Sequence, residues 1–370
     1  MVTVRAVVEL MEKWWPPRLA APWDNVGLLL GDKAEPVQSV ITCLTVTRSV
    51  VDEAVESGAG MVISHHPVLF SAVKKLTTDS VQGRNLLRLL AKKIAVYSPH
   101  TAHDSAPGGV NDQIATLLGL EKVVPLKPRV ENVKCKLVVF IPASGLEKLS
   151  QALFQTGAGV IGKYTECSFW HPGSGTFHPG EGAQPALGQV GKRENVPEVR
   201  VEFLCDHGNL ERTVEALRAN HPYEEPAFDV YPLLPLKTDQ GEGRMGQLPA
   251  GLAAWELLLK CKGLFGGYPV QLIGPRDKTV KHVAIGCGAA GGWAPEAFGA
   301  GADVFVTGEM RYHEELEAYQ GGGCVILLSH HGSERFAMVR MAQRLQEAIP
   351  ALKVWAAQND DVERHFLPDS

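Results

Sequence analysis

The 370-residue sequence predicts an α/β (α+β) fold in which two related halves build one domain and a smaller domain is inserted between them. The segments AVESGAGMVIS (54–64) and AFGAGADVFVT (297–307) share one pattern, a helix end, a glycine turn, a strand and a hydroxyl residue. Each is followed by another apolar strand that ends in a histidine with a carboxylate four residues later, in IAVYSPHTAHD and CVILLSHHGSE. The sequence therefore predicts a helix–strand–strand module that occurs twice.

The composition is that of a folded protein with substantial cores. At 45% hydrophobic and 21% charged residues, the chain has material for two or three domains. A net charge of −5 gives no strong electrostatic signal for a nucleic-acid partner. No apolar run approaches the roughly 18–20 residues that a membrane span requires, so we expect no membrane partner either.

The chain begins with MVTVRAVVELMEKWWPP, which is typical of an amphipathic helix that ends at Pro16-Pro17. It lacks the apolar region and the cleavage site of a signal peptide. The seven cysteines are scattered without a CxxC motif, which argues against a disulfide framework. These features predict a cytoplasmic protein.

The middle of the chain has a different character. Strand-like KLVVFIP, helical GLEKLSQALFQTGAG, a Gly/Pro-rich stretch that begins ECSFW, strand-like EVRVEFLCD, helical NLERTVEALRANHP and strand-like AFDVYPL follow one another. This β-α-β-β-α-β order is typical of a ferredoxin-like domain. We therefore predict three segments: residues 1–128 and 236–370 as the two halves of the main domain, and 129–235 as the insert. The Gly- and Pro-rich residues 171–191 are expected to form either a mobile surface hairpin or the lip of a binding site.

Two His-His pairs indicate a metal site. Ser64-His65-His66-Pro67 and Ser329-His330-His331-Gly332 each end an apolar run. The carboxyl ends of parallel strands meet at one edge of a sheet, where ligands usually bind. A histidine and a carboxylate four residues apart share one face if a helical turn begins there. The expected donors are His65, His66, His100, Asp104, His330 and Glu334.

Six nitrogen and oxygen donors exceed the three or four ligands of a single zinc ion. They suit two divalent cations about 4 Å apart with one carboxylate between them. The absence of thiolates from the set favours Zn, Fe, Mn or Ni. The alternatives are structural histidines, and helix caps in the case of Asp104 and Glu334. His103 and His331 are expected to be solvated or to support the ligands.

Several motifs together resemble a known family. They are WDNVGLLLG (23–31), SHHP, YSPHTAHDSAPGGVN (97–111), ECSFWHPGSGTFHP (166–179), HPYEEPAFDVYPL (221–233), ADVFVTGE (302–309) and SHHGSE (329–334). In this order they resemble the Nif-three-like dinuclear-metal-centre family, whose bacterial members are usually labelled GTP cyclohydrolase 1 type 2 homologs. The resemblance implies two α/β halves in one metal-binding domain, an insert similar to the nitrogen-regulatory and copper-tolerance trimer proteins, and a toroidal homohexamer.

The resemblance also implies roles for individual residues. The family's ligand pattern falls on His65, His66, Asp104, His330 and Glu334, with Glu334 or Asp104 as the bridging carboxylate. His100 either binds metal or only hydrogen-bonds near it. Two departures stand out: Gly286-Cys287-Gly288-Ala289-Ala290-Gly291 replaces a Gly-Gly-Ser-Gly run found in many members, and Glu309 replaces an aspartate.

These observations predict metal-dependent hydrolysis, with His100 and Glu334 as the catalytic candidates. A water between two cations loses its proton near neutral pH and becomes a nucleophile. His100 or His103 would move protons, because imidazole titrates in the useful range. The resemblance implies a nucleotide substrate, with ring opening of GTP as the labelled reaction. The alternative is a non-catalytic hexameric protein that delivers, stores or senses metal.

Overall fold

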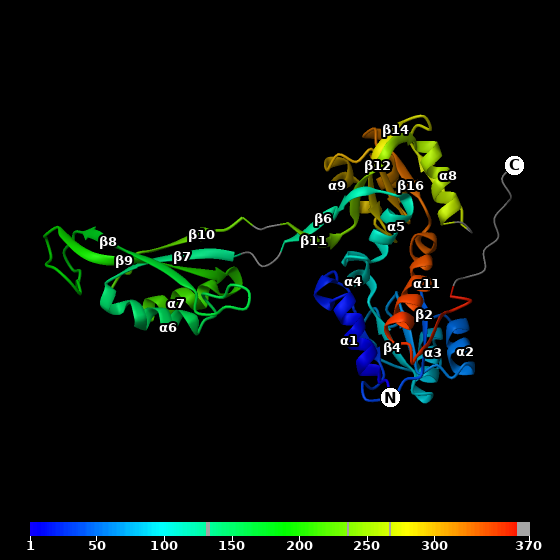
Figure 1. Ribbon diagram of the computed structural model, residues 1–370, viewed down its shortest axis with the longest axis horizontal. Helices are drawn as coiled ribbons and strands as arrows, with labels where there is room; N and C mark the ends of the chain where they lie inside the picture. Colours follow the sequence, from blue (N-terminus) through cyan, green and yellow to red (C-terminus); the bar gives the residue numbers. More distant parts are fainter. Residues whose placement is uncertain (131–133, 235–236, 266–267, 361–370) are drawn as a thin grey trace. The chain divides into compact units, whose positions relative to one another are not determined.

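The computed structural model describes residues 1–130, 134–234, 237–265 and 268–360. The chain divides into two compact units, Met1–Arg129 with Asp239–Ser370, and Val130–Thr238. Figure 1 shows both. The expected boundary between residues 235 and 236 lies outside the described residues, as does the end of the chain from residue 361.

The first sheet of the larger unit has the strand order β1-β4-β3-β2-β17. The strands are β1 (Gly27–Leu30), β2 (Ser39–Cys43), β3 (Met61–Ser64), β4 (Ala95–Ser98) and β17 (Lys353–Ala356). The neighbours from β4 to β17 run parallel, and β1 is antiparallel to β4. Every residue of β3 and β4 is buried, which explains why these strands are continuous apolar runs without alternation.

The second sheet has the order β13-β16-β15-β14-β12-β5. Its strands are β5 (Glu121–Val124), β12 (Arg244–Ala253), β13 (Gln271–Ile273), β14 (Thr279–Gly286), β15 (Val304–Thr307) and β16 (Val325–Leu327). Strands β14, β15 and β16 are parallel, and β13 is antiparallel to β16. This sheet therefore contains the arrangement of β2, β3, β4 and β1 a second time.

The helices repeat as well. The first sheet carries α2 (Arg48–Glu56), α3 (Val81–Ala91) and α4 (His100–Ser105), and the second carries α9 (Ala294–Gly299), α10 (Tyr312–Gln320) and α11 (His330–Ala348). The expected module lacked one element, because α3 and α10 each lie between its two strands. The omission follows from giving weight to the apolar strands, whereas α10 is largely exposed and α3 is amphipathic, with exposed residues between its buried ones.

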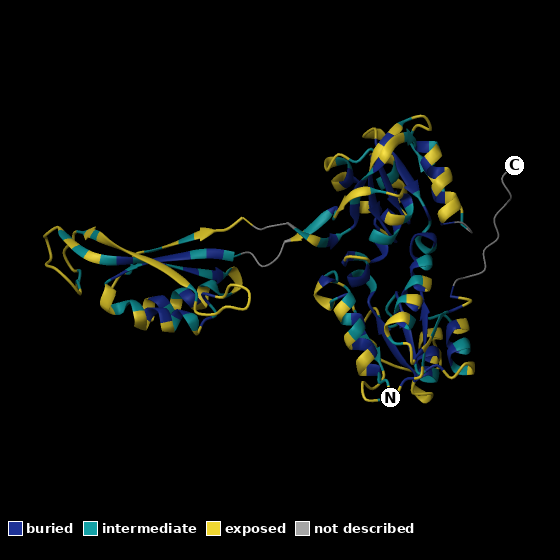
Figure 2. Ribbon diagram, in the orientation of Figure 1, coloured by how far each residue is buried: buried dark blue, intermediate teal, exposed yellow. Residues whose placement is uncertain are grey.

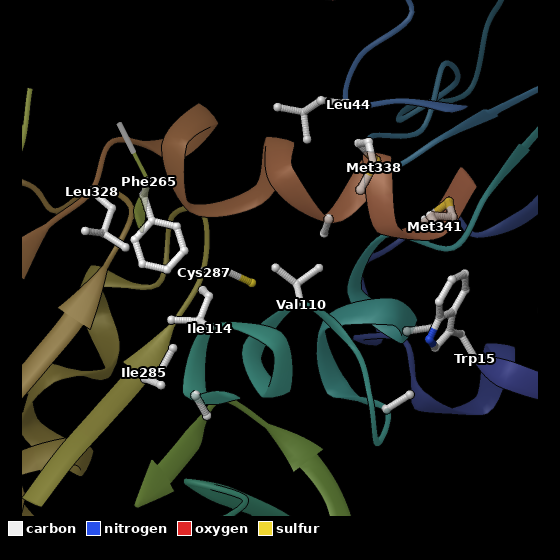
Figure 3. Close-up of a cluster of buried hydrophobic side chains, with 14 of the residues drawn as sticks. Trp15, Leu44, Val110, Ile114, Phe265, Ile285, Cys287, Leu328, Met338 and Met341 are labelled. Carbon is white, nitrogen blue, oxygen red and sulfur yellow. The ribbon is translucent and has the colours of Figure 1, made fainter. Parts of the chain in front are cut away.

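The two halves exchange strands. Strand β5 comes from the first half and pairs with β12 of the second sheet, while β17 comes from the second half and pairs with β2 of the first. Helix α11 crosses between the sheets, and its Met338 carbonyl accepts a hydrogen bond of 2.8 Å from the Thr42 hydroxyl of β2. One apolar cluster joins α11, α1 (Val4–Trp14), α5 (Val110–Leu118) and α8 (Ala254–Leu264) (Figure 3). The halves therefore form one folding unit.

The smaller unit contains β7 (Lys134–Ile141), α6 (Leu146–Phe154), β8 (Ser168–Phe177), β9 (Glu194–Asp206), α7 (Leu210–Asn220) and β10 (Phe228–Pro232). Its sheet has the order β10-β7-β9-β8 with antiparallel neighbours. The two helices lie on one face of the sheet and cover an apolar core of their own (Figure 2). The element order is the one expected from the sequence.

The structure forms an antiparallel hairpin of β8 and β9 around the Gly- and Pro-rich residues 171–191, but the first of these residues are strand and not loop. Residues 171–177 belong to β8, which pairs with β9 from Ser168↔Phe203 to Phe177↔Glu194. Backbone pairing along β9 keeps these residues extended although Gly and Pro are frequent among them. The connection between the strands is therefore 178–193.

The remaining elements are short. Strands β6 (Lys127–Val130) and β11 (Lys237–Glu242) form a two-stranded sheet, and the 3-10 turns are η1 (Pro17–Leu19), η2 (Ala143–Gly145), η3 (His207–Asn209) and η4 (Gly291–Trp293). All seven cysteines are free, as expected. Among the helices that the structure describes, none combines the length and the apolar character required to cross a membrane.

Candidate metal centre

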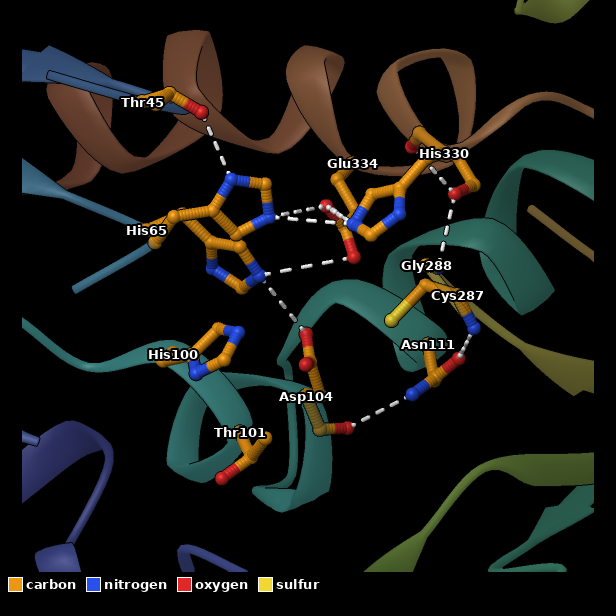
Figure 4. A network of polar contacts seen from close by, with 12 residues as sticks. Thr45, His65, His100, Thr101, Asp104, Asn111, Cys287, Gly288, His330 and Glu334 are labelled. Atoms are coloured by element: carbon orange, nitrogen blue, oxygen red, sulfur yellow. Dashed lines mark hydrogen bonds and ion pairs between the residues drawn. The ribbon is translucent and has the colours of Figure 1, made fainter. Parts of the chain in front are cut away.

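The predicted donors lie at the ends of parallel strands. His65 and His66 follow β3 directly, His100 begins α4 after β4, and His330 begins α11 after β16. Asp104 and Glu334 follow one helical turn later on α4 and α11. All six side chains, which we call the ligand cluster, come together between the two sheets (Figure 4).

The start of α11 fixes the spacing of His330 and Glu334. Ser329 has a left-handed φ of 63°, and its hydroxyl accepts a hydrogen bond of 3.0 Å from the Gly332 amide. The helix therefore begins at His330, and His330 Nε2 lies 3.2 Å from Glu334 Oε2. The i, i+4 spacing places both side chains on one face, as the sequence predicted.

The Glu334 carboxylate lies between two groups of donors. Its Oε2 is 3.1 Å from His66 Nε2 and 3.2 Å from His330 Nε2, and these two nitrogens are 3.3 Å apart. Its Oε1 faces the other way, 3.9 Å from His65 Nε2, which is 3.5 Å from Asp104 Oδ1. Each carboxylate oxygen thus completes a separate group of three donors that could hold a cation.

Two outer hydrogen bonds orient the imidazoles. His66 Nδ1 is 2.8 Å from the Thr45 hydroxyl, and His330 Nδ1 is 3.0 Å from Glu309 Oε1. Metal-binding histidines commonly donate their second N–H to such a partner, which fixes the tautomer and directs the other nitrogen to the metal. Here both contacts direct Nε2 into the ligand cluster.

Several buried atoms of the cluster have no hydrogen-bond partner. Both ring nitrogens of the fully buried His65 and Asp104 Oδ1 are in this position. A buried polar group without a partner costs about 1–3 kcal/mol. A cation between His65, Asp104 and Glu334 would satisfy His65 Nε2 and Asp104 Oδ1, so the residues present fit a metal.

His100 is held by a carboxylate that the sequence analysis did not select. Its Nδ1 is 2.7 Å from Asp24 Oδ1, and Asp24 also accepts a hydrogen bond of 3.1 Å from the Thr101 amide. The His100 ring lies 5.4 Å from the His65 ring and 5.6 Å from the His66 ring, measured between centroids. His100 is therefore close enough to bind metal or to exchange protons beside it.

The charges in the cluster follow from burial and contact. Burial raises the pKa of Asp104 to about 7, and the neighbouring charge of Glu334 adds to this effect. Burial opposes ionisation of Glu334 as well, but hydrogen bonds from His330 and His66 hold its pKa well below the ordinary value. The hydrogen bond to Glu334 raises the pKa of His330 to about 9. Glu334 is thus the permanent anion of the cluster.

The remaining histidines respond differently. Burial lowers the pKa of His65 far enough to keep its imidazole neutral, as a metal ligand must be. Burial would also lower the pKa of His100, but the hydrogen bond to Asp24 raises it above the ordinary value. Burial would raise the pKa of Asp24, but its hydrogen bonds with His100 and Thr101 lower it. His100 and Asp24 therefore form an ion pair that holds a proton on the His100 imidazole, close to His65 and His66.

Two further histidines lie outside the cluster. His103 is not solvated, as one expectation had it, but completely buried, with its ring 4.0 Å from the Trp15 ring and 5.7 Å from the His65 ring. Burial lowers its pKa to about 3. His331 contacts Tyr268, with ring centroids 4.5 Å apart.

The glycine run after β14 packs against the cluster. Gly288 has a φ of +63°, and a Cβ at this position would meet Glu334 Oε1 at 2.2 Å. The Gly288 amide donates a hydrogen bond of 3.0 Å to the Ser333 hydroxyl. Close packing against Glu334 therefore explains this glycine.

The fold and the site define a class of protein: two parallel-sheet modules whose strand ends enclose a histidine- and carboxylate-rich candidate metal centre. The chain belongs to the Duf34/NIF3 (NGG1p interacting factor 3) family, whose model matches residues 2–361. The resemblance inferred from the motifs is thereby confirmed.

Similar proteins agree with this assignment. The chain is 36% identical over 327 residues to a Halalkalibacterium halodurans protein, covering 88% of each, and 35% identical over 333 residues to a Bacillus subtilis protein, covering 90% of this chain and 89% of that one. Both are named GTP cyclohydrolase 1 type 2 homolog. The crystal structure of a Bacillus cereus protein related to NIF3 is similar with 33% identity, a TM-score of 0.67 and coverage of 99% of both chains. A Staphylococcus aureus protein matches with 27% identity, a TM-score of 0.75 and the same coverage.

Proposed function

We propose that this protein is a dinuclear-metal-dependent hydrolase that acts on a nucleotide-like substrate. His66, His330 and Glu334 would hold one cation, and His65, Asp104 and Glu334 the other. The observation that carries the proposal is the orientation of Glu334, whose two oxygens face two separate donor groups. The donor set suits Zn, Fe, Mn or Ni.

Two cations would supply Lewis acidity and lower the pKa of bound water. Residues of the chain would transfer the proton and orient the metal ligands. The His100–Asp24 pair holds a proton on the imidazole, so His100 would deliver it to a leaving group as a general acid. Thr45 and Glu309 keep the imidazoles of His66 and His330 in position.

A pocket beside the cluster offers space for a substrate. It has a volume of about 390 Å³ and is lined by residues that include Tyr268, Gln271, Glu309, His330 and His331. Ligand pockets commonly measure 300–1,000 Å³. The Tyr268–His331 pair would stack on a planar base, which agrees with a nucleotide and with the names of the relatives.

We further propose that residues 1–128 and 236–370 are the two halves of the metal-binding domain, that the insert is a ferredoxin-like domain, and that the chain assembles as a homohexamer. The order β10-β7-β9-β8 with two helices on one face supports the assignment of the insert. Light scattering of purified protein tests the assembly, and a monomer would refute it.

A second function also has support. The chain would then hold cations without turnover, as a metal chaperone, a store or a regulatory scaffold. The burial of the ligands favours this alternative, because the side chains of His65 and Glu334 are only 0% and 4% exposed. Metal bound there would be well protected from solvent.

One experiment separates the two functions. Protein with restored metal is offered GTP and phosphodiesters, alongside His100→Gln and the exposed control His313→Gln. The hydrolase predicts turnover that falls in His100→Gln with unchanged metal content and with a shifted pH profile, while His313→Gln behaves as the parent. Absent turnover in fully loaded protein, with metal passing to an apo-acceptor, would refute the hydrolase.

A further inference from the structure

The smaller unit contains a cavity that the metal centre does not use. It has a volume of about 540 Å³, and its lining includes residues 174–180 on one side and residues 223–225 on the other. Both segments overlap motifs that carry the family resemblance, ECSFWHPGSGTFHP (166–179) and HPYEEPAFDVYPL (221–233). Neither motif contributes a side chain to the ligand cluster. The cavity is therefore a second candidate binding site.

The cavity lies on the face of the sheet that the helices leave open. Val139 and Ile141 of β7 belong to the apolar core under α6 and α7, and successive side chains of a strand point to opposite faces. Phe140, which lines the cavity, therefore points away from the helices. The connection 178–193 contributes to the wall, and the Gln184 amide donates a hydrogen bond of 2.9 Å to Glu224 Oε2. This contact holds the connection at the rim of the cavity.

Gly175 makes room for a carboxylate in the cavity. A Cβ at this position would meet Glu198 Oε2 at 1.9 Å, so the Glu198 side chain lies directly against the backbone of β8. Glu198 lines the cavity as well. In the described part of the smaller unit, Glu202 and Glu225 form ion pairs with Lys or Arg, whereas Glu198 forms none. Its negative charge therefore has no counter-ion in the described structure.

The neighbouring basic residues do not supply one. His221 Nδ1 accepts a hydrogen bond of 3.0 Å from the Tyr223 amide, and its Nε2 lies 3.0 Å from the Phe140 carbonyl oxygen, so the ring is neutral. Arg193 and Arg218 contact lining residues from outside, and no Lys or Arg is among the described residues that line the cavity. A positively charged ligand would balance the charge of the site.

Aromatic rings form another part of the wall. The Phe177 and Tyr223 rings have centroids 6.2 Å apart, with an angle of 52° between their planes. The Tyr223 hydroxyl is buried and has no hydrogen-bond partner, although buried polar groups nearly always have one. A ligand with an N–H donor would provide that partner. Aromatic rings also attract organic cations, because their faces carry negative charge.

We propose that this cavity binds a small organic cation, an alkylammonium with an apolar body. The ammonium group would donate hydrogen bonds to the Glu198 carboxylate and to the Tyr223 hydroxyl. The apolar body would contact Phe177 and the prolines of the connection. The volume lies within the range of about 300–1,000 Å³ that is common for small-molecule sites. The inference depends neither on the metal centre nor on hydrolysis, because no residue of the cavity belongs to the ligand cluster.

Three probes of similar shape and different charge test the proposal on the full chain: phenethylammonium, neutral phenethyl alcohol and anionic hydrocinnamate. Saturation-transfer NMR detects their binding, and calorimetric titration measures the dissociation constants. We expect phenethylammonium to bind about tenfold or more tightly than the alcohol, and hydrocinnamate not to bind. Glu198→Gln, and Gly175→Ala, whose methyl group displaces the carboxylate, should weaken phenethylammonium binding to the level of the alcohol. Glu215→Gln, an exposed carboxylate on α7, is the matched control and should bind as the parent does.

Each contrary outcome overturns the proposal. Equal affinity for the three probes would show that charge plays no part, and failure of phenethylammonium to bind the parent would show that the cavity is not such a site. Binding by Glu198→Gln as tight as that of the parent, or an equal loss in Glu215→Gln, would place the cation elsewhere. Circular dichroism establishes that the variants are folded, and the comparison of probes on the unaltered chain requires no variant at all.

Discussion

Replacing Glu334 by Gln should weaken the binding of both cations, not of one. The two oxygens of Glu334 face different donor groups, at 3.1 and 3.2 Å on one side and 3.9 Å on the other. The amide that replaces the carboxylate has nearly the same shape but carries no charge, and one of its two ends is a donor. The substitution therefore removes a shared ligand from both positions.

The size of the effect follows from the charge. Two unit charges about 4 Å apart at an effective dielectric constant of about 20 interact by about 4 kcal/mol. This corresponds to about a thousandfold in a dissociation constant. Burial of Glu334, at 4% exposure, keeps solvent from screening the loss. We therefore expect each cation to bind at least about a thousandfold more weakly.

Competition with a chromophoric chelator measures both dissociation constants. Glu317→Gln, which changes an exposed carboxylate on α10, is the matched control and should bind two cations as the parent does. If Glu334→Gln still bound one cation with the affinity of the parent, the carboxylate would not be shared, and the proposed centre would be refuted.

Three further predictions concern the surroundings of the cluster. Glu309→Gln weakens the partner of a ligand and should lower metal affinity about 10–100-fold in the same titration; unchanged affinity would show that this contact is irrelevant. His103 has a folded pKa of about 3, so only the unfolded chain binds its proton between about pH 6.5 and 3, and stability falls as the pH drops. Between pH 7 and 5 the loss of unfolding free energy due to His103 amounts to about 2 kcal/mol. Urea titrations of metal-free protein should therefore show a smaller loss in His103→Phe than in the parent. Equal losses would contradict the burial argument. Arg244, at 2% exposure, binds the Asp112 carboxylate and four backbone carbonyls, two of which lie at the end of α4. The side chain thus connects β12 to α4, and Arg244→Met should cost about 3 kcal/mol or more of unfolding free energy. Arg48→Met, in an exposed pair, should cost no more than about 1 kcal/mol, and equal costs would refute the difference.

The candidate donors that follow the repeated strands have local signatures. His330 and Glu334 were selected because an apolar run ends in a histidine with a carboxylate one helical turn later, and His66 because a His-His pair ends an apolar run. Asp24 and Thr45 have none. They lie on connections after η1 and after β2, and only tertiary packing brings them to His100 and His66.

The same distinction applies to the fold. The parallel strands and the order of elements in the insert follow from local patterns, but the exchange of β5 and β17 between the sheets does not. β17 pairs with β2 across more than three hundred residues, and no local pattern specifies such a partner. Helices α3 and α10 were missed for a different reason, since neither forms a continuous apolar run.

A crystal structure of metal-loaded protein, with anomalous diffraction recorded at the absorption edge of the metal, tests the central claim most directly. We predict two anomalous peaks on either side of the Glu334 carboxylate, one among His66, His330 and Glu334 and the other among His65, Asp104 and Glu334. A single peak, or peaks elsewhere in the chain, would contradict the account.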